Sequence, residues 1–288
     1  MKILIVGASG MLGYSLFTNL SDYAELSVFG TIRKNELDDS FKGYESNVFT
    51  SIDVEDFESV KTVVENLKPN YVLNCVGLIK QTEVAKKHVS AISINSLLPH
   101  RLAHLCDSVS AKFIHFSTDC VFTGSQGMYT EMHSPDSIDL YGLSKKLGEV
   151  DYGHHLTLRT SIIGHELNSN LSLIEWFLSQ EGNVKGFTKA VFSGLPTCYI
   201  AKLLAEKIFG NAISGMYHLS VDKINKFDLL TLVSEIYKKD IIIAPDDSLG
   251  VDRSLDSSKL RASIEFNPPS WRELVLYMHE DFLRRYKR

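Results

Sequence analysis

Tyr141 and Lys145 are the two residues whose types and spacing best suit acid–base chemistry. If the segment around them is helical, residues four positions apart lie on one face, so the lysine ammonium can approach the phenol. A phenol ordinarily keeps its proton to a pKa of about 10, and a nearby cation stabilises the phenolate. Such a tyrosine is a usable acid near neutral pH, so the pair predicts proton delivery to an alkoxide.

Thr118 supplies a third chemical group. It follows the apolar run Phe113 to Phe116, which is typical of a buried strand, and a hydroxyl at a strand end can hydrogen-bond to a substrate carbonyl. Because the chain has 12 tyrosines, an isolated Tyr-x-x-x-Lys on a solvated helix face is also expected by chance. The order of the surrounding motifs favours the catalytic interpretation.

A glycine pattern, Gly7-x-x-Gly10-x-x-Gly13, directly follows the short apolar run Ile3 to Val6. Met11 to Leu20 then carries apolar residues at helical spacing. Glycines let the backbone turn tightly and approach a pyrophosphate, whose charge is favourable at a helix N-terminus. The pattern predicts a dinucleotide site between the first strand and the first helix.

Arg33 and Lys34 follow a second predicted strand, residues 26–32. Dinucleotide folds that select NAD place an acidic residue near this point, whereas a basic residue suits the 2′-phosphate of NADP. We therefore expect NADP(H) as the coenzyme, with NAD(H) as the alternative. The competing interpretation is a pair of solvated loop charges.

Taken in order, these motifs resemble the extended short-chain dehydrogenase/reductase family. The phrase Ser-Thr-Asp-Cys-Val-Phe-Thr-Gly at 117–124 is most similar to the dTDP-4-dehydrorhamnose reductase branch, and phrases at 215–218, 252–256 and 271–274 extend the resemblance over nearly the whole chain. The chain departs from the branch at 189–197, at 78–83 and in the single proline, Pro135, before the tyrosine. These positions bear on the choice of sugar more than on the chemistry.

The resemblance implies an α/β fold, a doubly wound parallel Rossmann sheet with a smaller C-terminal substrate-binding lobe. Strands and helices that alternate through the first 160 residues support it. We expect residues 1–163 to form the NADP-binding domain. Residues 164–288 should form mainly the substrate lobe, with some segments returning to the Rossmann sheet.

The same resemblance assigns roles to individual residues. The expected catalytic residues are Thr118, Tyr141 and Lys145, and the expected substrate-binding residues are Thr118, Asp119 and Arg253. The expected cofactor-binding residues are Gly7, Ser9, Gly10, Met11, Leu12, Gly13, Arg33, Lys34, Asp53, Val54, Cys75, Val76, Gly77, Asn95, Tyr141 and Lys145. In the family, the asparagine at the position of Asn95 stabilises a helix irregularity. For Arg253 the competing interpretation is a surface ion pair with Asp252 or Asp256.

The implied activity is an NADP(H)-dependent oxidoreductase that reduces a nucleotide-activated 4-keto-6-deoxy sugar in polysaccharide or O-antigen precursor synthesis. The nucleotide, dTDP, UDP or GDP, stays open. Two alternatives remain: a nucleotide-sugar epimerase or dehydratase on the same scaffold, and a cofactor-binding regulatory subunit like that of methionine adenosyltransferase. Turnover of NADPH with a keto-sugar nucleotide separates the reductase from the regulatory subunit.

Composition limits the remaining classes of partner. A net charge of −5 with dispersed lysines and arginines argues against nucleic-acid binding. No apolar run reaches membrane-spanning length, and the N-terminal run is too short for a signal-peptide core, so we expect a cytoplasmic protein. The four cysteines lack metal-site spacing, and no metal is expected. The expected state is a monomer or homodimer that binds a nucleotide sugar.

Overall fold

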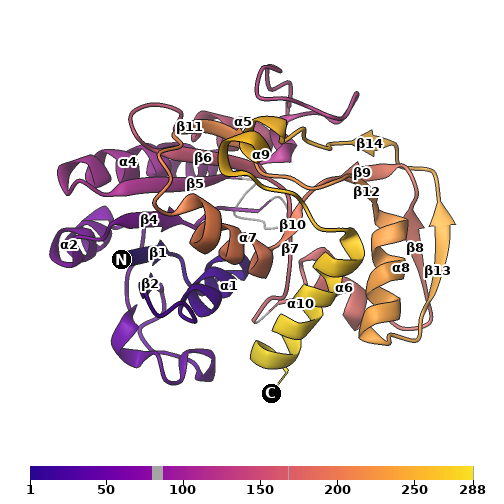
Figure 1. Cartoon of the computed structure of the whole chain (residues 1–288), viewed down its shortest axis with the longest axis horizontal. Coiled ribbons are helices and arrows are strands. Elements are labelled where there is room, and N and C mark those ends of the chain that lie inside the picture. The colour runs from indigo at the N-terminus through magenta and orange to yellow at the C-terminus, as the bar shows by residue number, and fades with distance from the viewer. Residues whose placement is uncertain (80–86, 168, 288) are drawn as a thin grey trace. The chain divides into compact units, whose positions relative to one another are not determined.

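The computed structural model describes residues 1–79, 87–167 and 169–287 (Figure 1). Residues 80–83 of the departing phrase at 78–83 lie outside this range. The chain divides into two compact units whose segments alternate along the sequence. The first unit comprises 1–117, 138–158 and 212–216, and the second comprises 118–137, 159–211 and 217–288. The division of cofactor and substrate binding at residues 163 and 164 remains a prediction.

A seven-stranded sheet runs in the order β11-β6-β5-β4-β1-β2-β3. Its strands are β1 (Lys2–Val6), β2 (Ser27–Thr31), β3 (Val48–Phe49), β4 (Tyr71–Asn74), β5 (Lys112–Thr118), β6 (Leu156–Thr160) and β11 (Gly215–His218). β1 pairs in parallel with both β2 and β4, β2 pairs in parallel with β3, and β4 with β5. The chain thus extends the sheet in one direction from β1 to β3 and then returns to extend it in the other from β4. This order confirms the doubly wound α/β fold and places a topological switch between β1 and β4.

The helices of the first unit cover both faces of its strands. They are α1 (Met11–Leu20), α2 (Phe57–Leu67), α3 (His88–Ala91), α4 (Leu98–Ser108) and α5 (Leu140–Leu147), with short turns η1 (Asp39–Phe41) and η2 (Glu45–Asn47) and a π-helical turn η4 (Ile92–Leu97). Leu4 and Val6 join one apolar cluster with residues of α2 and α4. Side chains alternate along a strand, so Ile3 and Ile5, which are fully buried, point to the opposite face.

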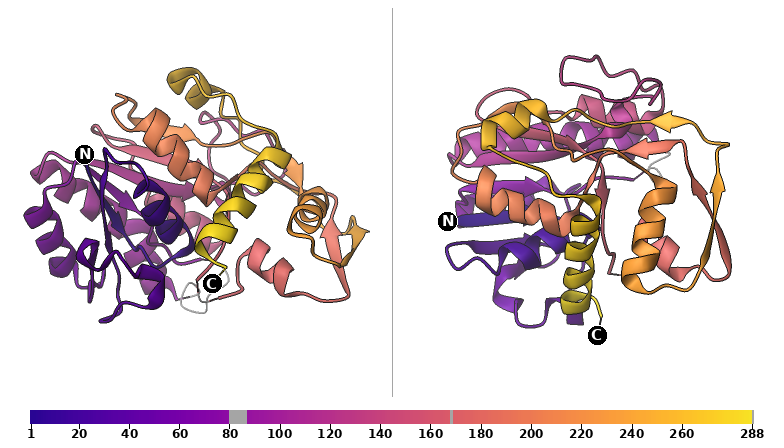
Figure 2. Two further views of the ribbon diagram at one scale, coloured as in Figure 1. Left: turned by 60° about the horizontal axis from the view of Figure 1, so that its bottom comes forward. Right: turned by 45° about the vertical axis from the view of Figure 1, so that its right-hand side comes forward.

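The second unit consists of shorter sheets and helices. Its elements are η5 (Asp119–Val121), β7 (Ile162–Ile163), α6 (Leu173–Ser179), β8 (Asn183–Phe187), β9 (Ala190–Phe192), β10 (Leu195–Pro196), α7 (Thr197–Leu203), η6 (Leu204–Ile208), β12 (Ile224–Asn225), α8 (Lys226–Tyr237), β13 (Ile242–Asp246), β14 (Val251–Asp252), α9 (Ser258–Ile264) and α10 (Trp271–Arg285). α8 packs on β8 and β13, while α10 packs on α7 and α8 (Figure 2).

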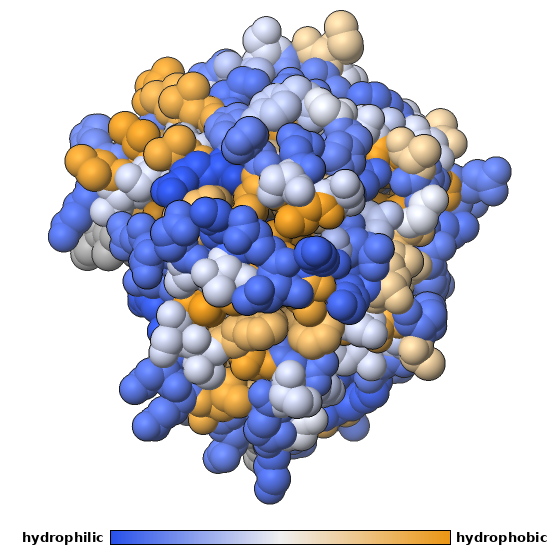
Figure 3. Space-filling model, turned by 90° about the vertical axis from the view of Figure 1, so that its left-hand side faces the viewer, coloured by the Kyte–Doolittle hydropathy of each residue, from blue (hydrophilic) through white to orange (hydrophobic). Residues whose placement is uncertain are grey.

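No helix among the described residues has the length and apolar character needed to cross a bilayer. The face drawn in Figure 3 is mostly hydrophilic, with apolar side chains at its upper left edge and in smaller patches across its middle and lower part. The cysteines are all free thiols, two of them buried and two half-buried.

Candidate functional site

The loop between β1 and α1 has the shape that a pyrophosphate requires. Gly7 adopts φ +90°, and a Cβ there would lie 2.6 Å from Val76 Cγ2. A Cβ on Gly13 would lie 2.0 Å from the Gly7 carbonyl oxygen, so helix and loop approach as closely as glycine allows. Gly10 precedes α1 without a side-chain cap, which leaves the first backbone N–H groups directed at the loop. Ser9, Met11 and Leu12 occupy the same turn.

Arg33 and Lys34 lie just beyond the strand that supports this loop. Thr31, at the end of β2, receives the Ala8 N–H on its carbonyl oxygen at 2.8 Å and the Gly7 N–H on its hydroxyl at 3.2 Å. Both basic side chains are exposed, and Lys34 lies 3.7 Å from Asp38. The positions suit recognition of a phosphate at the edge of the dinucleotide site, while the role itself remains a prediction.

The remaining predicted cofactor residues occupy the ends of β3 and β4. Asp53 receives the Glu55 N–H at 3.0 Å in the turn that leads into α2, and Val54 packs against the apolar cluster of that face. Cys75 donates its N–H to the Val6 carbonyl at 3.0 Å, which brings the segment 75–77 beside the glycine loop. Burial raises the pKa of the Cys75 thiol, so the thiol remains protonated and unreactive.

Asn95 lies within the π-helical turn η4, as the resemblance implies. Its Oδ1 accepts the Leu78 N–H at 2.8 Å, and its Nδ2 donates to the Leu78 carbonyl at 3.2 Å and to Ser144 Oγ at 3.1 Å. Ser96 donates to the Ser144 carbonyl at 2.8 Å. The irregular turn therefore fixes α5 and the segment after β4, which makes Asn95 a support of the site in addition to its predicted cofactor role.

Tyr141 and Lys145 both lie on α5, as the spacing predicts. The helix begins at Leu140 because Asp139 Oδ1 accepts the Gly142 N–H at 2.9 Å as an N-cap. Lys145 is buried and donates from Nζ to the Phe116 carbonyl on β5 at 2.8 Å. Burial lowers the Lys145 pKa to about 8, with the Glu149 carboxylate acting in the opposite direction. Lys145 can therefore exchange a proton near neutral pH.

Thr118, the last residue of β5, and Asp119, which follows it, begin the second unit. Thr118 Oγ1 donates to Asp119 Oδ1 at 3.2 Å and accepts the Cys120 N–H at 3.1 Å. Burial raises the Asp119 pKa, while the Arg253 charge and a hydrogen bond from Ser161 act against that rise. The Thr118 hydroxyl retains an acceptor lone pair and a proton that it can redirect to a substrate carbonyl.

Arg253 lies in the second unit with Asp119. Its Nε donates to the Phe122 carbonyl at 2.9 Å, and neither Nη group hydrogen-bonds to another residue of the described chain. Asp252 instead lies 3.7 Å from Lys223, and Asp256 receives the Ser258 N–H at 2.7 Å. The described contacts therefore do not include the surface ion pair considered for Arg253. The guanidinium presents two donors suited to a phosphate or carboxylate.

His218 anchors the segment 118–137 within the second unit. Its Nδ1–H donates to the Tyr129 carbonyl at 2.9 Å, and Arg159 Nη1 lies 3.3 Å from Nε2, which must therefore accept. Burial first, and the Arg159 charge as well, lower the His218 pKa to about 4 despite the Glu131 carboxylate. His218 is therefore uncharged in the folded protein at neutral pH.

The stability of the protein should fall as pH falls below about 6.5 because of His218. The unfolded chain protonates this side chain near its ordinary pKa of 6.5, whereas the folded protein does so only near pH 4. More protons are then bound by the unfolded state, so His218 should lower the free energy of unfolding by about 2 kcal/mol between pH 7 and pH 5. Urea unfolding of wild type and His218→Gln at both pH values isolates this contribution. Equal pH dependence in the two proteins would contradict it.

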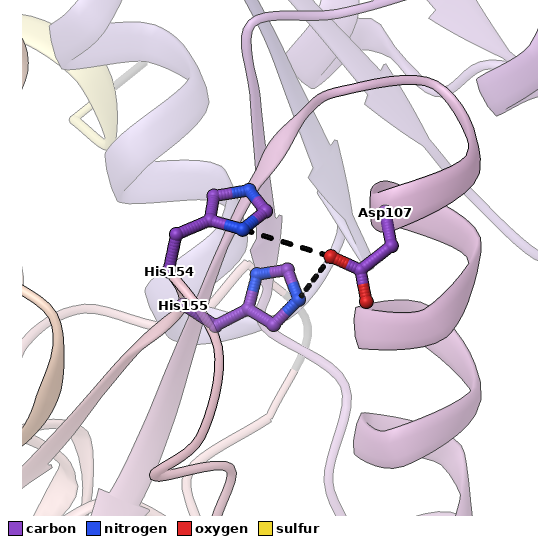
Figure 4. A group of neighbouring side chains, drawn as sticks. All are labelled: Asp107, His154 and His155. Atoms are coloured by element: carbon purple, nitrogen blue, oxygen red, sulfur yellow. Dashed lines mark ion pairs between the residues drawn. The ribbon is translucent and has the colours of Figure 1, made fainter.

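A separate cluster of Asp107, His154 and His155 was missed by the sequence reasoning, although the adjacent histidines were a visible signal (Figure 4). Asp107 Oδ1 lies 3.6 Å from His154 Nδ1 and 3.3 Å from His155 Nε2. His155 Nδ1 accepts the Phe113 N–H at 3.2 Å, so Nε2 carries the proton of the neutral ring and lies near Asp107 without a hydrogen bond to it. A protonated Nε2 is no metal ligand, which leaves two of the three groups for coordination.

Comparison with known proteins identifies the family to which the chain belongs. A protein-family model described as "RmlD substrate binding domain" matches residues 1–284. The chain belongs to the RmlD substrate binding domain family. This result confirms the predicted branch of the extended short-chain dehydrogenase/reductases.

Individual relatives of this RmlD-family chain include enzymes and a subunit of another enzyme. The dTDP-4-dehydrorhamnose reductase of Streptomyces griseus is 32% identical over 147 residues, which cover 51% of this chain and 43% of that protein. This chain therefore matches less than half the length of that relative. The methionine adenosyltransferase 2 subunit beta of Danio rerio is 27% identical over 253 residues, 82% of this chain and 74% of that protein.

A solved structure shares the fold. The dTDP-4-dehydrorhamnose reductase of Bacillus anthracis str. Ames, in complex with NADP, aligns with a TM-score of 0.79 at 20% identity over 97% of this chain and 99% of that one. That protein binds the coenzyme predicted for this RmlD-family chain.

Proposed function

We propose that this RmlD-family protein is an NADP(H)-dependent reductase of a nucleotide-linked 4-keto-6-deoxy sugar. The observation that carries the proposal is the buried Lys145 one helical turn from Tyr141, with its amine on the β5 carbonyl two residues before Thr118. The finer expectations, a role in polysaccharide or O-antigen precursors and a cytoplasmic location, follow from the family resemblance. The expected monomer or homodimer and the nucleotide-sugar partner belong to the same proposal.

The first unit fits a dinucleotide. The glycine loop, the uncapped start of α1 and the exposed Arg33 would hold the phosphates, while Asp53 and the segment 75–77 would line the rest. NADPH, when bound, supplies a hydride to the sugar carbonyl carbon. The packing of Gly7 and Gly13 supports this fit independently of activity, because a Cβ at Gly7 would clash with Val76 and a Cβ at Gly13 would clash with the Gly7 carbonyl oxygen.

The residues of this chain then act on protons and orientation. Thr118 hydrogen-bonds to the substrate carbonyl oxygen and orients it, and Tyr141 gives its phenolic proton to the alkoxide that hydride arrival creates. Lys145 stabilises the phenolate and supplies a proton that restores the phenol. Arg253 binds the diphosphate of the substrate.

Two other functions have sequence support. The Danio rerio relative favours a cofactor-binding subunit without turnover, and a nucleotide-sugar epimerase or dehydratase can share the scaffold. NADPH consumption should be measured against 4-keto-6-deoxy sugars on dTDP, UDP and GDP. Steady oxidation with one of them supports the reductase. Tightly held NAD with no net consumption would favour the epimerase, and binding without any turnover would favour the regulatory subunit.

Coenzyme preference should depend on Arg33. Wild type should prefer NADPH over NADH, and Arg33→Asp should lose about 10-fold to 100-fold of that preference, because a charge-assisted contact to a phosphate contributes about 1.5–3 kcal/mol. Ratios of kcat/KM for the two coenzymes give the measurement. The control is Lys61→Asp, at a half-buried lysine that pairs with Glu58 at 3.3 Å. Equal efficiency with both coenzymes in wild type would refute the assignment.

Substrate affinity should depend on Arg253. Arg253→Ala should raise the KM of the sugar nucleotide roughly 10-fold to 100-fold and leave NADPH affinity unchanged, since a forked contact to the diphosphate is lost. Arg261→Ala is the matched control, because Arg261 pairs with Asp222 at 3.5 Å in the same unit. If the substrate KM stays at the wild-type value, Arg253 has a structural role only.

A further inference from the structure

His115 is a buried histidine that the proposed mechanism leaves unused. It lies on β5 within the apolar run Phe113 to Phe116, and only 1% of it is exposed. Its two ring nitrogens face two polar groups of the same unit, Asn74 at the end of β4 and Lys145 on α5. The tautomer of His115 decides which ring nitrogen donates a hydrogen bond and which accepts one.

The proton position on His115 follows from Asn74. The Oδ1 atom of Asn74 accepts the Val76 N–H at 3.1 Å, which fixes the orientation of the amide. Its Nδ2 then lies 3.2 Å from His115 Nδ1. An amide nitrogen donates only, so Nδ1 accepts and the single proton of the neutral ring is on Nε2.

The protonated Nε2 of His115 faces Lys145 Nζ at 3.5 Å. A lysine ammonium has donors only and cannot accept this N–H, whereas the uncharged amine has a lone pair that can. Two donors that face each other repel. The distance of 3.5 Å between Lys145 Nζ and His115 Nε2 is accordingly longer than the 2.8 Å between Nζ and the Phe116 carbonyl oxygen. His115 thus disfavours the charged form of Lys145 relative to the uncharged one.

We propose that His115 is a positioning residue for Lys145. Asn74 keeps the proton of the His115 ring on Nε2, and this N–H stabilises the uncharged amine of Lys145. The lysine can then release and regain a proton in each turnover. The inference rests on the proposed function. The N–H bond of the Lys145 ammonium breaks as the O–H bond of Tyr141 forms again. Nε2–H of His115 then donates to the amine lone pair, until a proton from solvent restores the ammonium.

The pKa shifts of His115 and Lys145 agree with a neutral histidine beside a lysine that can lose its proton. The titratable groups near Lys145 are Glu149, whose carboxylate is charged, and Cys75, whose thiol stays protonated, while His100 acts on His115 together with Lys145. Burial first, and then the Lys145 charge, lower the His115 pKa well below 6.5, so the ring stays neutral. The Lys145 pKa of about 8 lies where the amine can change its protonation state during catalysis.

The tautomer can be observed without any activity measurement. In wild-type protein with ¹⁵N-labelled histidine, NMR should show His115 Nε2 protonated and Nδ1 unprotonated at every pH at which the protein is folded. A proton on Nδ1 would overturn the inference. Asn74→Asp should reverse the tautomer, because a carboxylate accepts from Nδ1–H and leaves the Nε2 lone pair toward Lys145.

The pH dependence of kcat tests the effect on Lys145. Wild-type kcat should fall above about pH 8 as Lys145 loses its proton. In His115→Gln the amide can turn its carbonyl oxygen to the Lys145 ammonium, and in Asn74→Asp the reversed ring presents the Nε2 lone pair to it. In both variants the high-pH limb of kcat should therefore move upward by about one pH unit, the shift that one hydrogen bond to a charged group supports, with KM values retained. His155→Gln, at a buried histidine with no contact to Lys145 among the described residues, should leave it in place.

The outcomes separate this inference from the function on which it rests. An unmoved limb in both active variants contradicts the role of His115 and leaves the reductase assignment intact. Full activity of Lys145→Met would instead remove the proposed function.

Discussion

Replacing Tyr141 by phenylalanine should lower kcat by about 10²-fold to 10⁴-fold while the fold and NADPH binding persist. The substitution removes one phenolic oxygen from α5, and the alkoxide that hydride transfer leaves on the sugar then has no positioned acid. Because the lost interaction forms only with the developing charge, KM should change little. Steady-state kinetics with the active keto-sugar nucleotide and NADPH titration give the two measurements.

A matched tyrosine controls for general damage to the first unit. Tyr152 hydrogen-bonds from its hydroxyl to His100 at 2.7 Å, and Tyr152→Phe should retain activity. A folded Tyr141→Phe protein that binds NADPH normally and turns over at near wild-type rate would assign proton donation to another residue.

Replacing Lys145 by methionine should lower kcat by about 10²-fold or more and also weaken NADPH binding by about 10-fold. The buried amine both stabilises the Tyr141 phenolate and, by the family resemblance, holds the nicotinamide ribose, so the two effects should appear together. Methionine keeps the length of the side chain and loses the donor to the Phe116 carbonyl. Circular dichroism and coenzyme titration distinguish this loss from unfolding.

The neighbouring lysine provides the control. Lys146 lies on the same helix, is 43% exposed in its side chain and pairs with Glu149 at 3.2 Å. Lys146→Met should leave both kcat and NADPH affinity near wild type. If the two lysine variants behave alike, the effect belongs to helix charge and not to the site.

Local patterns in the sequence were enough to predict the elements of the first unit. An apolar run followed by glycine, or a tyrosine and a lysine at helical spacing, depends on neighbouring residues, and the positions of β1, α1 and α5 agree with the structure. The π-helical turn at Asn95 was found through the family resemblance, since no spacing rule indicates it.

Contacts between distant residues could not be predicted in this way. Asn95 meets Ser144 across 49 positions, and His115 meets Asn74 across 41, so neither pair leaves a periodic signal in the sequence. The apolar segment at 184–192 is divided into β8, which pairs with β13, and β9, which pairs with β12 and β14. An apolar run shows that a segment is buried and does not show which partner it pairs with.

Transfer of the hydride itself is the most direct test of the central claim. NADPH carrying deuterium at the transferred position of the nicotinamide should be incubated with the protein and its keto-sugar nucleotide, and the product examined by mass spectrometry and NMR. The account predicts one deuterium on the former carbonyl carbon, in proportion to the NADP⁺ formed. A protein that binds NADPH yet leaves the sugar unlabelled would contradict it.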